Sequence, residues 1–290
     1  MTEAVAVRPS FRERLFTSQD GLRLYARDYG EPRSDQPAVL CLAGVTRNGK
    51  DFHRVAKRLA ARWRVLCPDY RGRGQSESDP NWRNYQARTY LDDLRHMLAA
   101  FNVPRVVVIG TSLGGLLAMA MAVASPSLVA AAVINDIGPT IETTGLGTIV
   151  NYMKDDRPMA NWPAAVERLR TTFPDLPAKT EADWLTLAQY VYREQPDGRV
   201  VFSWDPAIVK PMLIPVAPPP DLWRLFRSLG DRPVLLVRGE RSAILSEATA
   251  ERMKAEMPRL QSVTVPGVGH APLLTEPEAE IALDAFLAQL

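Results

Sequence analysis

Ser112 stands at the centre of a Gly-x-Ser-x-Gly motif formed by residues 110–114. An apolar, β-branched run precedes the motif, and a segment rich in Ala, Leu and Met with helical character follows it. A strand that turns sharply into a helix in this way exposes the serine hydroxyl as a nucleophile, and the two glycines leave room for the turn. The N–H of Leu113 would then face any oxygen that becomes negative beside Ser112. A tight strand–helix turn in some other α/β protein would look the same over these five residues. The rest of the chain must therefore distinguish a nucleophilic serine from an ordinary turn.

A nucleophilic serine needs a base, and the chain has three histidines. His53 and His96 lie in segments with helical spacing, where we predict solvated or capping roles. His270 follows Gly267-Val268-Gly269, in a loop after the last predicted core strand. If His270 were only an exposed loop residue, Ser112 would be left without a base.

The segments around Ser112 alternate between predicted strands and helices. Two short strands at residues 11–18 and 22–29 are joined by an Asp-Gly turn. Apolar runs predict further strands at residues 38–44, 64–69, 106–109, 128–137, 233–239 and 262–265. Helices are predicted at residues 51–61, 89–101, 114–125, 246–257 and from about 276. This alternation predicts an α/β protein with a mostly parallel, doubly wound sheet.

The segment at residues 139–229 has a different composition. Prolines are dense there, and it holds four of the six tryptophans, Trp162, Trp184, Trp204 and Trp223. Trp184, Leu187 and Val191 follow a helical spacing, and the segment shows no strong strand pattern. We therefore predict a core of residues 1–138 and 230–290 with an inserted helical cap at residues 139–229.

The overall composition excludes several classes of function. Lys and Arg number 35 against 33 Asp and Glu, so a net charge of +2 gives no electrostatic reason to bind nucleic acid or an anionic membrane. Cys41 and Cys67 fall in predicted buried strands and indicate no disulfide framework. No signal-peptide or membrane-spanning pattern is seen, which predicts a cytoplasmic protein. Because no phosphate-binding glycine loop and no metal-ligand spacing occur, we expect neither cofactor nor metal; the oligomeric state stays open.

The motifs, in their order along the chain, resemble the α/β-hydrolase fold superfamily. They are the loop at residues 43–48, the segment at residues 69–76, the Gly-x-Ser-x-Gly turn and the terminal Gly-x-Gly-His. The resemblance covers nearly the whole chain except the cap. It implies that His270 is the general base and that the Val45 N–H joins that of Leu113 in an oxyanion hole. Many members carry His-Gly where this chain has Ala43-Gly44, but the donors are backbone groups, so the exchange need not remove the hole.

Two of these loops carry arginines, at position 47 and at positions 71 and 73. Arg47 and Asn48 could orient a polar or anionic group of a substrate, and an arginine that braces the loop is the other interpretation. Asp69, Arg71 and Arg73 resemble a packing and loop-bracing motif of the fold rather than catalytic residues.

The acid that should orient His270 is not at its usual place. Similar hydrolases carry an Asp a few residues after the strand that ends at Gly239, but Ala243 occupies that position here, and Glu240 is too close to the strand end to reach His270. Asp136, at the end of the preceding core strand, could supply the carboxylate, as it does in some members such as the haloalkane dehalogenases. The chain could instead be an inactivated variant with Ala in place of Asp, or a natural relative that binds without turnover.

The resemblance implies a hydrolase of carboxylic esters that acts on a small molecule through an acyl-enzyme. Ser112 would be the nucleophile, His270 the base, and Asp136 the candidate acid, with a cap over an apolar pocket. A lactonase or a carbon–carbon bond hydrolase would use the same residues, and a ligand-binding member of the fold without activity is the alternative from another class. Epoxide hydrolase and dehalogenase chemistry are disfavoured, because those relatives need an Asp where Ser112 stands.

Overall fold

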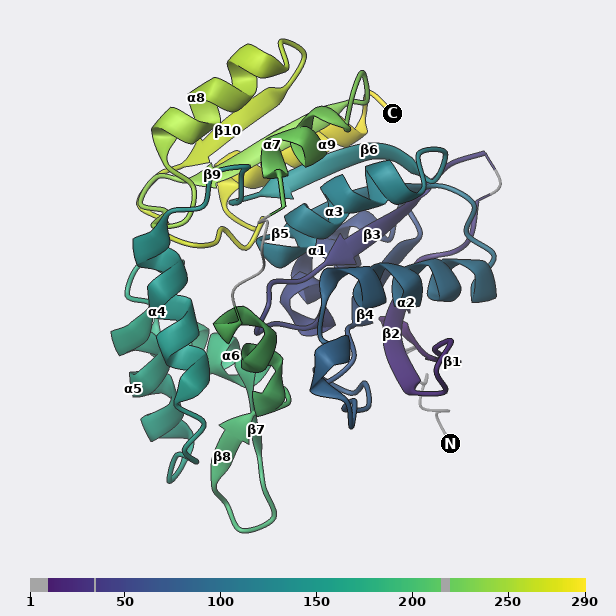
Figure 1. The fold of residues 1–290 in the computed structure, drawn as a ribbon. Helices are drawn as coiled ribbons and strands as arrows, with labels where there is room; N and C mark the ends of the chain where they lie inside the picture. The colour runs from purple at the N-terminus through teal and green to yellow at the C-terminus, as the bar shows by residue number, and fades with distance from the viewer. Residues whose placement is uncertain (1–9, 34, 215–219) are drawn as a thin grey trace, which may run out of the picture.

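An eight-stranded sheet forms the centre of the computed structural model, which describes residues 10–33, 35–214 and 220–290 (Figure 1). The strand order across the sheet is β1-β2-β4-β3-β5-β6-β9-β10. The strands of this sheet are β1 Arg12–Thr17, β2 Arg23–Tyr29, β3 Ala38–Leu42, β4 Val65–Asp69, β5 Val106–Thr111, β6 Val129–Asn135, β9 Val234–Gly239 and β10 Gln261–Val265. The strands β2 and β1 run antiparallel to their neighbours, and the other strands pair in parallel. The predicted mostly parallel, doubly wound sheet is confirmed.

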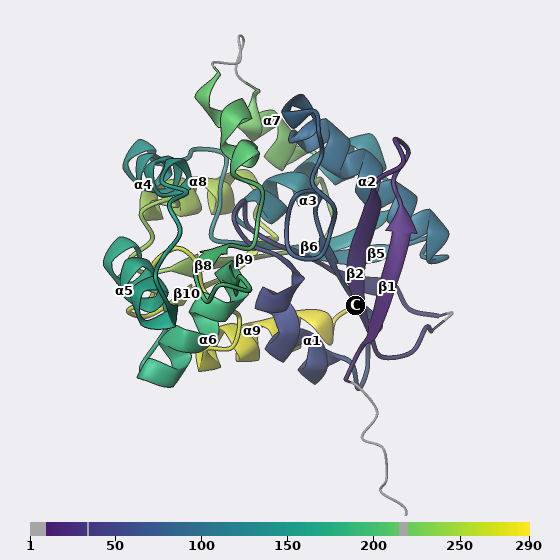
Figure 2. The ribbon, with the colours of Figure 1, turned by 90° about the horizontal axis from the view of Figure 1, so that it is seen from below.

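Helices cover both faces of this sheet (Figure 2). The helices of the core are α1 His53–Leu59, α2 Ala87–Ala100, α3 Leu113–Ala124, α7 Leu222–Arg227, α8 Glu247–Glu256 and α9 Pro277–Leu287, with short 3-10 turns η1 Gly49–Phe52 and η2 Trp82–Asn84. On one face α1 and α9 lie side by side, where Arg58 forms ion pairs with Glu280 and Asp284, and α2 and α3 cover the opposite face. Because both faces are covered, β3 and β4 are buried along their whole length.

The two cysteines lie inside this buried layer. Cys41 in β3 and Cys67 in β4 are fully buried free thiols. Burial raises the pKa of the Cys67 thiol, which keeps it protonated and unreactive. No helix within the described residues is long and apolar enough to span a bilayer.

Between β6 and β9 the chain leaves the sheet and forms a separate layer, which we call the insert. Its elements are α4 Thr143–Lys154, α5 Trp162–Thr172, α6 Glu181–Val191, β7 Tyr192–Glu194, β8 Val200–Phe202 and η3 Pro206–Leu213. The β7–β8 hairpin was not predicted, because strands of three residues are too short to show a pattern. The last part of the predicted cap behaves differently: α7 packs on α3, where Ser228 Oγ donates to the Met119 carbonyl over 3.4 Å.

The carboxyl ends of β3, β5, β6 and β9 meet at the edge of the sheet that the insert faces (Figure 1). Each of these strands is followed by one of the loops singled out from the sequence. In open α/β sheets this edge is the usual place of a ligand site. The parallel topology therefore brings residues from four distant segments to one place.

Candidate active site

Ser112 lies between β5 and α3 in a strained backbone conformation, with φ at 53°. Close packing around this turn requires its glycines, since a Cβ on Gly110 would overlap the Gly114 backbone and one on Gly114 would overlap Leu42. The Ser112 N–H donates to the Asn135 carbonyl over 2.9 Å, which ties the turn to the end of β6. A serine held at positive φ is costly by itself, and such strain is typical of an exposed nucleophile on this turn.

A chain of hydrogen bonds joins Ser112 to His270 and Asp136. His270 Nε2 lies 3.0 Å from Ser112 Oγ, and His270 Nδ1 lies 2.8 Å from Asp136 Oδ2. The Asp136 side chain is fully buried, whereas the His270 side chain keeps 15% of its exposure. A buried carboxylate on Nδ1 holds the proton on that nitrogen, so Nε2 is free to accept the serine proton. The structure thus brings together the three residues that the sequence placed 24 and 134 positions apart.

Two groups that the sequence did not single out hold this chain in place. The Gly239 N–H, at the end of β9, donates to Asp136 Oδ1 over 2.8 Å. The buried Asn135 donates from Nδ2 to Thr111 Oγ1 at 2.9 Å and to the Pro272 carbonyl at 2.8 Å. Asn135 therefore ties β5 to the loop that carries His270. The Asn-Asp pair at the end of a buried strand was the only signal in the sequence for this role.

The loop after β3 lies across the cavity from His270. A Cβ on Gly44 would lie 3.7 Å from the Ser112 Cβ, so the backbone of this loop runs close to the serine. Val45 lines the same cavity, and Leu113 is the first residue of α3. Within the described part of the chain, no backbone hydrogen bond uses the N–H of Val45 or of Leu113. Both groups are thus available as donors beside Ser112.

Two buried side chains fix the carbonyl groups of this loop. Tyr70 Oη donates to the Ala43 carbonyl over 3.2 Å, and Arg73 Nε donates to the Val45 carbonyl over 2.7 Å. The interpretation of residues 69–76 as a brace therefore fits the structure. Asp69, which is buried, accepts from the N–H groups of Gly49 and Gln75, and burial raises its pKa to about 6. Its contact with Gly49 connects the brace to the end of the same loop.

Arg47 lies in the wall of the cavity, whereas Asn48 is buried in the loop beside it. Arg47 lines the cavity, where its guanidinium pairs with Asp51 through contacts of 2.6 and 3.0 Å. Asn48 is buried, with Oδ1 accepting from the Lys50 N–H and Nδ2 donating to the Tyr190 carbonyl. Its side chain caps η1 and anchors α6. Both polar atoms of Asn48 thus bond within the protein, and Asn48 is absent from the described residues that line the cavity.

The vacant acid position lies close to the site without contributing to it. Ala243 is exposed and lines a cavity that His270 also lines. Glu240 points elsewhere, since its Oε2 accepts from the Gly267 N–H over 2.6 Å. The carboxylate that reaches His270 comes from Asp136 on the neighbouring strand. Although position 243 carries no acid, His270 therefore still has a carboxylate partner, Asp136.

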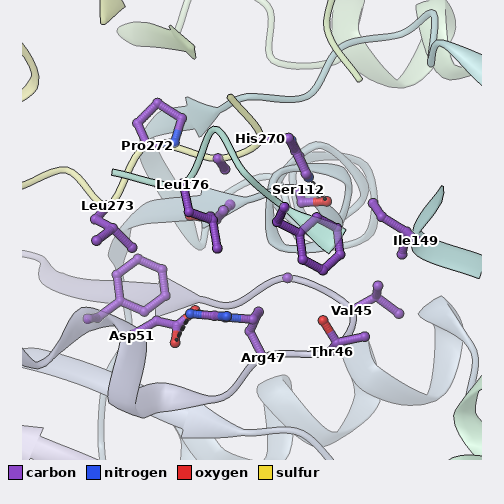
Figure 3. Close-up of a pocket in the computed structure, with 15 residues that line it drawn as sticks. Val45, Thr46, Arg47, Asp51, Ser112, Ile149, Leu176, His270, Pro272 and Leu273 are labelled. Atoms are coloured by element: carbon purple, nitrogen blue, oxygen red, sulfur yellow. Dashed lines mark hydrogen bonds and ion pairs between the residues drawn. The ribbon is translucent and has the colours of Figure 1, made fainter. Parts of the chain in front are cut away.

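The cavity above Ser112 has walls from both the core and the insert (Figure 3). His270 lies beside Ser112, and the loop with Val45, Thr46 and Arg47 faces them from the other side. Ile149 of α4 and Leu176, after α5, close the cavity from the insert. The insert also holds the histidine loop, because the Asp175 carbonyl accepts from the Gly269 N–H over 2.7 Å.

The two other histidines lie outside this site. His53 begins α1, where Nδ1 forms a 3.0 Å hydrogen bond with the Tyr29 hydroxyl, and His96 lies on α2. Within residues 10–33, 35–214 and 220–290, no group of three or more His, Cys, Asp or Glu side chains could hold a metal ion.

Known proteins share this architecture. A family model described as the alpha/beta hydrolase family matches residues 39–285. The 3-hydroxybutyrate-oligomer hydrolase of Cupriavidus necator is 32% identical over 270 residues, which cover 90% of this chain and 91% of that protein. The 2-(acetamidomethylene)succinate hydrolase of Mesorhizobium japonicum is 28% identical and covers 86% of each chain. The crystal structure of an alpha/beta hydrolase from Novosphingobium aromaticivorans matches with a TM-score of 0.91 and 42% identity, over 98% of this chain and 100% of that one.

The family match spans most of the chain, and the two relatives described above, which match over most of their own length, are named as hydrolases. The predicted resemblance and fold are thereby confirmed. On this evidence the chain is a member of the alpha/beta hydrolase family.

Proposed function

We propose that the protein hydrolyses carboxylic esters through an acyl-enzyme on Ser112. The observation that carries this proposal is the continuous chain of hydrogen bonds from Ser112 through His270 to Asp136. A serine hydroxyl is a weak nucleophile until a base takes its proton, and this chain provides that base in the required orientation. The free N–H groups of Val45 and Leu113 beside the serine supply the second requirement, an oxyanion hole.

The reaction follows from these positions. Ser112 Oγ attacks the ester carbonyl while His270 Nε2 takes the hydroxyl proton, and the carbonyl oxygen gains the negative charge that the two N–H groups stabilise. His270 then gives this proton to the alcohol oxygen as the C–O bond breaks, which leaves the acyl group on Ser112. A water molecule, deprotonated by His270, attacks the acyl carbon, and the proton returns to Ser112 as the acid leaves. Each oxyanion donor is worth roughly 3–4 kcal/mol of the barrier.

The insert acts in this proposal as a cap. Ile149 and Leu176 line the cavity over Ser112, which limits the solvent around the serine and strengthens the electrostatic interactions there. The short contact between Asp175 and Gly269 would couple the position of the cap to the histidine loop. A cap that covers the nucleophile favours small-molecule substrates over polymers.

The relatives suggest which esters to test first. The relative from Cupriavidus necator is named for the hydrolysis of 3-hydroxybutyrate oligomers, and it matches nine-tenths of this chain. Such oligomers carry ester bonds between short hydroxy acids. We propose linear esters of this kind as substrates, with 3-hydroxybutyrate dimer and trimer as the first compounds.

Labelling of Ser112 tests the proposal directly. A fluorophosphonate should add to Ser112 in the intact protein, as seen by peptide mass spectrometry, and should abolish turnover of 4-nitrophenyl butyrate and of the dimer. The Ser112→Ala variant should neither label nor turn over ester. Ser125→Ala, at the opposite end of α3, is the matched control and should behave as the unmodified protein.

Two results would contradict the proposal. A protein whose serine does not label and that hydrolyses none of these esters would be a ligand-binding member of the family. Activity that survives Ser112→Ala would mean that another residue is the nucleophile.

A further inference from the structure

Two cavities meet at Ser112, and they differ in size and lining. The first, of about 80 Å³, contains His270, Arg47 and Asp51 in its walls. The second, of about 180 Å³, has Ser112 and Val45 in its wall, and His270 is absent from the described residues that line it. Most of the second cavity is apolar, with walls that include Leu113, Leu116, Ile141, Leu146, Ile149 and Ile208.

The position of His270 decides which part of an ester each cavity receives. The histidine must protonate the departing alcohol oxygen, so the alcohol part lies on the side of Nε2. The acyl part then extends away from the histidine, past the two oxyanion donors. We therefore name the first cavity the leaving-group chamber and the second the acyl chamber. This assignment rests on the function proposed above.

Arg73 is the one charged residue among the described residues that line the acyl chamber. Its side chain is almost fully buried, at 2% exposure, and it is one of the residues that line this chamber. Its guanidinium donates through Nε to the Val45 carbonyl and through Nη1 to the Arg71 carbonyl and Tyr90 hydroxyl. Its charge also lies over the rings of Tyr70 and Tyr90. All of these partners are neutral.

The other buried arginines are paired with carboxylates. Arg64 meets Asp28, and the buried Arg71 meets three acids: Asp20, Asp79 and Asp93. Within the described part of the chain, no ion pair involves Arg73 and no hydrogen bond uses its Nη2. A buried cation is costly unless its charge and its donors find partners. The N–H groups on Nη2 thus have no partner among the described residues, and Arg73 lines the acyl chamber.

We propose that the acyl chamber binds acyl groups that carry a second oxygen atom, and that Arg73 holds this oxygen through Nη2. The acceptor is a carbonyl, hydroxyl or carboxylate oxygen placed along an otherwise apolar chain. The apolar walls bind the carbon atoms, and the arginine adds a directional contact that an alkyl group cannot make. Acyl groups of hydroxy-acid oligomers have this composition, whereas plain fatty acyl groups do not.

Competition between matched acyl groups tests this proposal. We would compare 4-nitrophenyl hexanoate with its 4-oxo and 5-oxo analogues and with the 4-nitrophenyl monoester of adipic acid. All four have the same leaving group and six acyl carbons. Each kcat/KM is divided by the rate constant for hydrolysis by hydroxide, to remove differences in intrinsic reactivity. A hydrogen bond from a charged donor predicts a preference of about 10- to 100-fold for the best oxygenated acyl group over hexanoate.

Variants then connect the preference to Arg73. In Arg73→Met the ratio of oxygenated to plain acyl groups should fall to near one, even if the lost contact with Val45 lowers every rate. Arg73→Lys should keep a preference for the adipate monoester, which separates an anionic acceptor from a neutral one. Arg47→Met, in the leaving-group chamber, is the matched control and should leave the acyl ratio unchanged.

The ratio in the intact protein tests the proposal even if Arg73→Met does not fold, and Arg73→Lys, which keeps the charge, then provides the comparison at this position. A ratio near one in the unmodified protein, with normal turnover of hexanoate, overturns the role of Arg73 and leaves the esterase proposal standing. A preference that survives Arg73→Met also overturns it. If no ester is hydrolysed and Ser112 does not label, the proposed function fails, and this inference fails with it.

Discussion

The ends of β6 and β9 are neighbours in the sheet, and they contribute different groups to the hydrogen bonds at His270. The end of β6 provides Asp136, whose Oδ2 lies 2.8 Å from His270 Nδ1. The end of β9 provides no acid: the Gly239 N–H donates to the other oxygen of Asp136, and Ala243 follows in an exposed loop. Together the two strand ends hold a single buried carboxylate in one orientation.

The two strand ends thus have separate roles in the proposed mechanism. The end of β6 provides the carboxylate at His270 Nδ1, and the end of β9 provides a donor that fixes this carboxylate. Asp136 has φ at 56°, a left-handed conformation that Asp tolerates better than most residues. The turn after β6 can therefore direct its side chain toward His270. Because Asp136 supplies this carboxylate, the loop after β9 does not have to carry an acid.

Of the variants that test the two strand ends, Asp136→Asn should have the largest effect on kcat. Because the Gly239 N–H needs an acceptor, the Asn oxygen will face Gly239 and its NH₂ group will face His270 Nδ1. The proton of the histidine then moves to Nε2, which can no longer accept the serine proton. We expect a loss of about 10⁴-fold in kcat with little change in KM, as for loss of the acid from a similar triad.

The matched control for this variant is Asp197→Asn. Its carboxylate pairs with Arg199 at 2.7 Å on the surface, so this change should alter kcat by less than about twofold. Thermal unfolding of both variants checks that the fold is intact. A loss of less than tenfold in Asp136→Asn would mean that another group orients His270.

Gly239→Ala tests the part that β9 plays. A Cβ at this position would overlap the Gly269 carbonyl and lie 2.6 Å from the Val268 carbonyl, so the loop before His270 must shift. A displacement of about 1 Å at the base predicts a loss of about 100-fold in kcat. Overpacking should also lower the free energy of unfolding by about 1–3 kcal/mol, measured by urea denaturation.

Gly147→Ala is the control for the added methyl group. This residue lies on α4 with no atom within 4 Å of the new Cβ, so stability should be unchanged or rise by up to about 1 kcal/mol. Full activity in Gly239→Ala would show that the histidine loop tolerates movement. The end of β9 would then contribute nothing beyond its N–H group.

The sequence predicted the central strands well because their physical cause is local. β3 lies within the predicted residues 38–44 and β9 within 233–239, since strands covered on both faces need continuous apolar runs. The turn at Ser112 was also predicted from local features, because its two glycines lie between an apolar run and a segment of helical character. The hairpin of β7 and β8 had no such signal at three residues a strand.

The choice of acid and the surroundings of Arg73 could not be predicted in the same way. Whether Asp136 or a residue near 243 reaches His270 depends on how two loops turn after parallel strands. Arg73 lies in a segment that resembles a brace, and it does bond to Val45. That its guanidinium meets no carboxylate among the described residues, and that it lines the acyl chamber, follow only from contacts between distant segments.

Ala243→Asp should give the smallest changes in kcat, and it compares the two strand ends directly because it places an acid after β9. In an Asp136→Ala background, which removes the carboxylate without leaving an amide on Nδ1, the new acid can enter the cavity of about 150 Å³ that Ala243 and His270 both line. We expect it to restore kcat by about tenfold or more, which is ~1.4 kcal/mol of barrier.

With Asp136 in place, Ala243→Asp is a substitution on the surface beside a histidine that already has its partner. It should therefore change kcat by less than about twofold, or ~0.5 kcal/mol, in assays with 4-nitrophenyl butyrate. A gain of orders of magnitude in this single variant would mean that Asp136 does not function as the acid and that position 243 lost it. No recovery in the double variant, with a folded protein, would mean that the β9 loop has turned away from the histidine, so that only β6 can now provide the carboxylate.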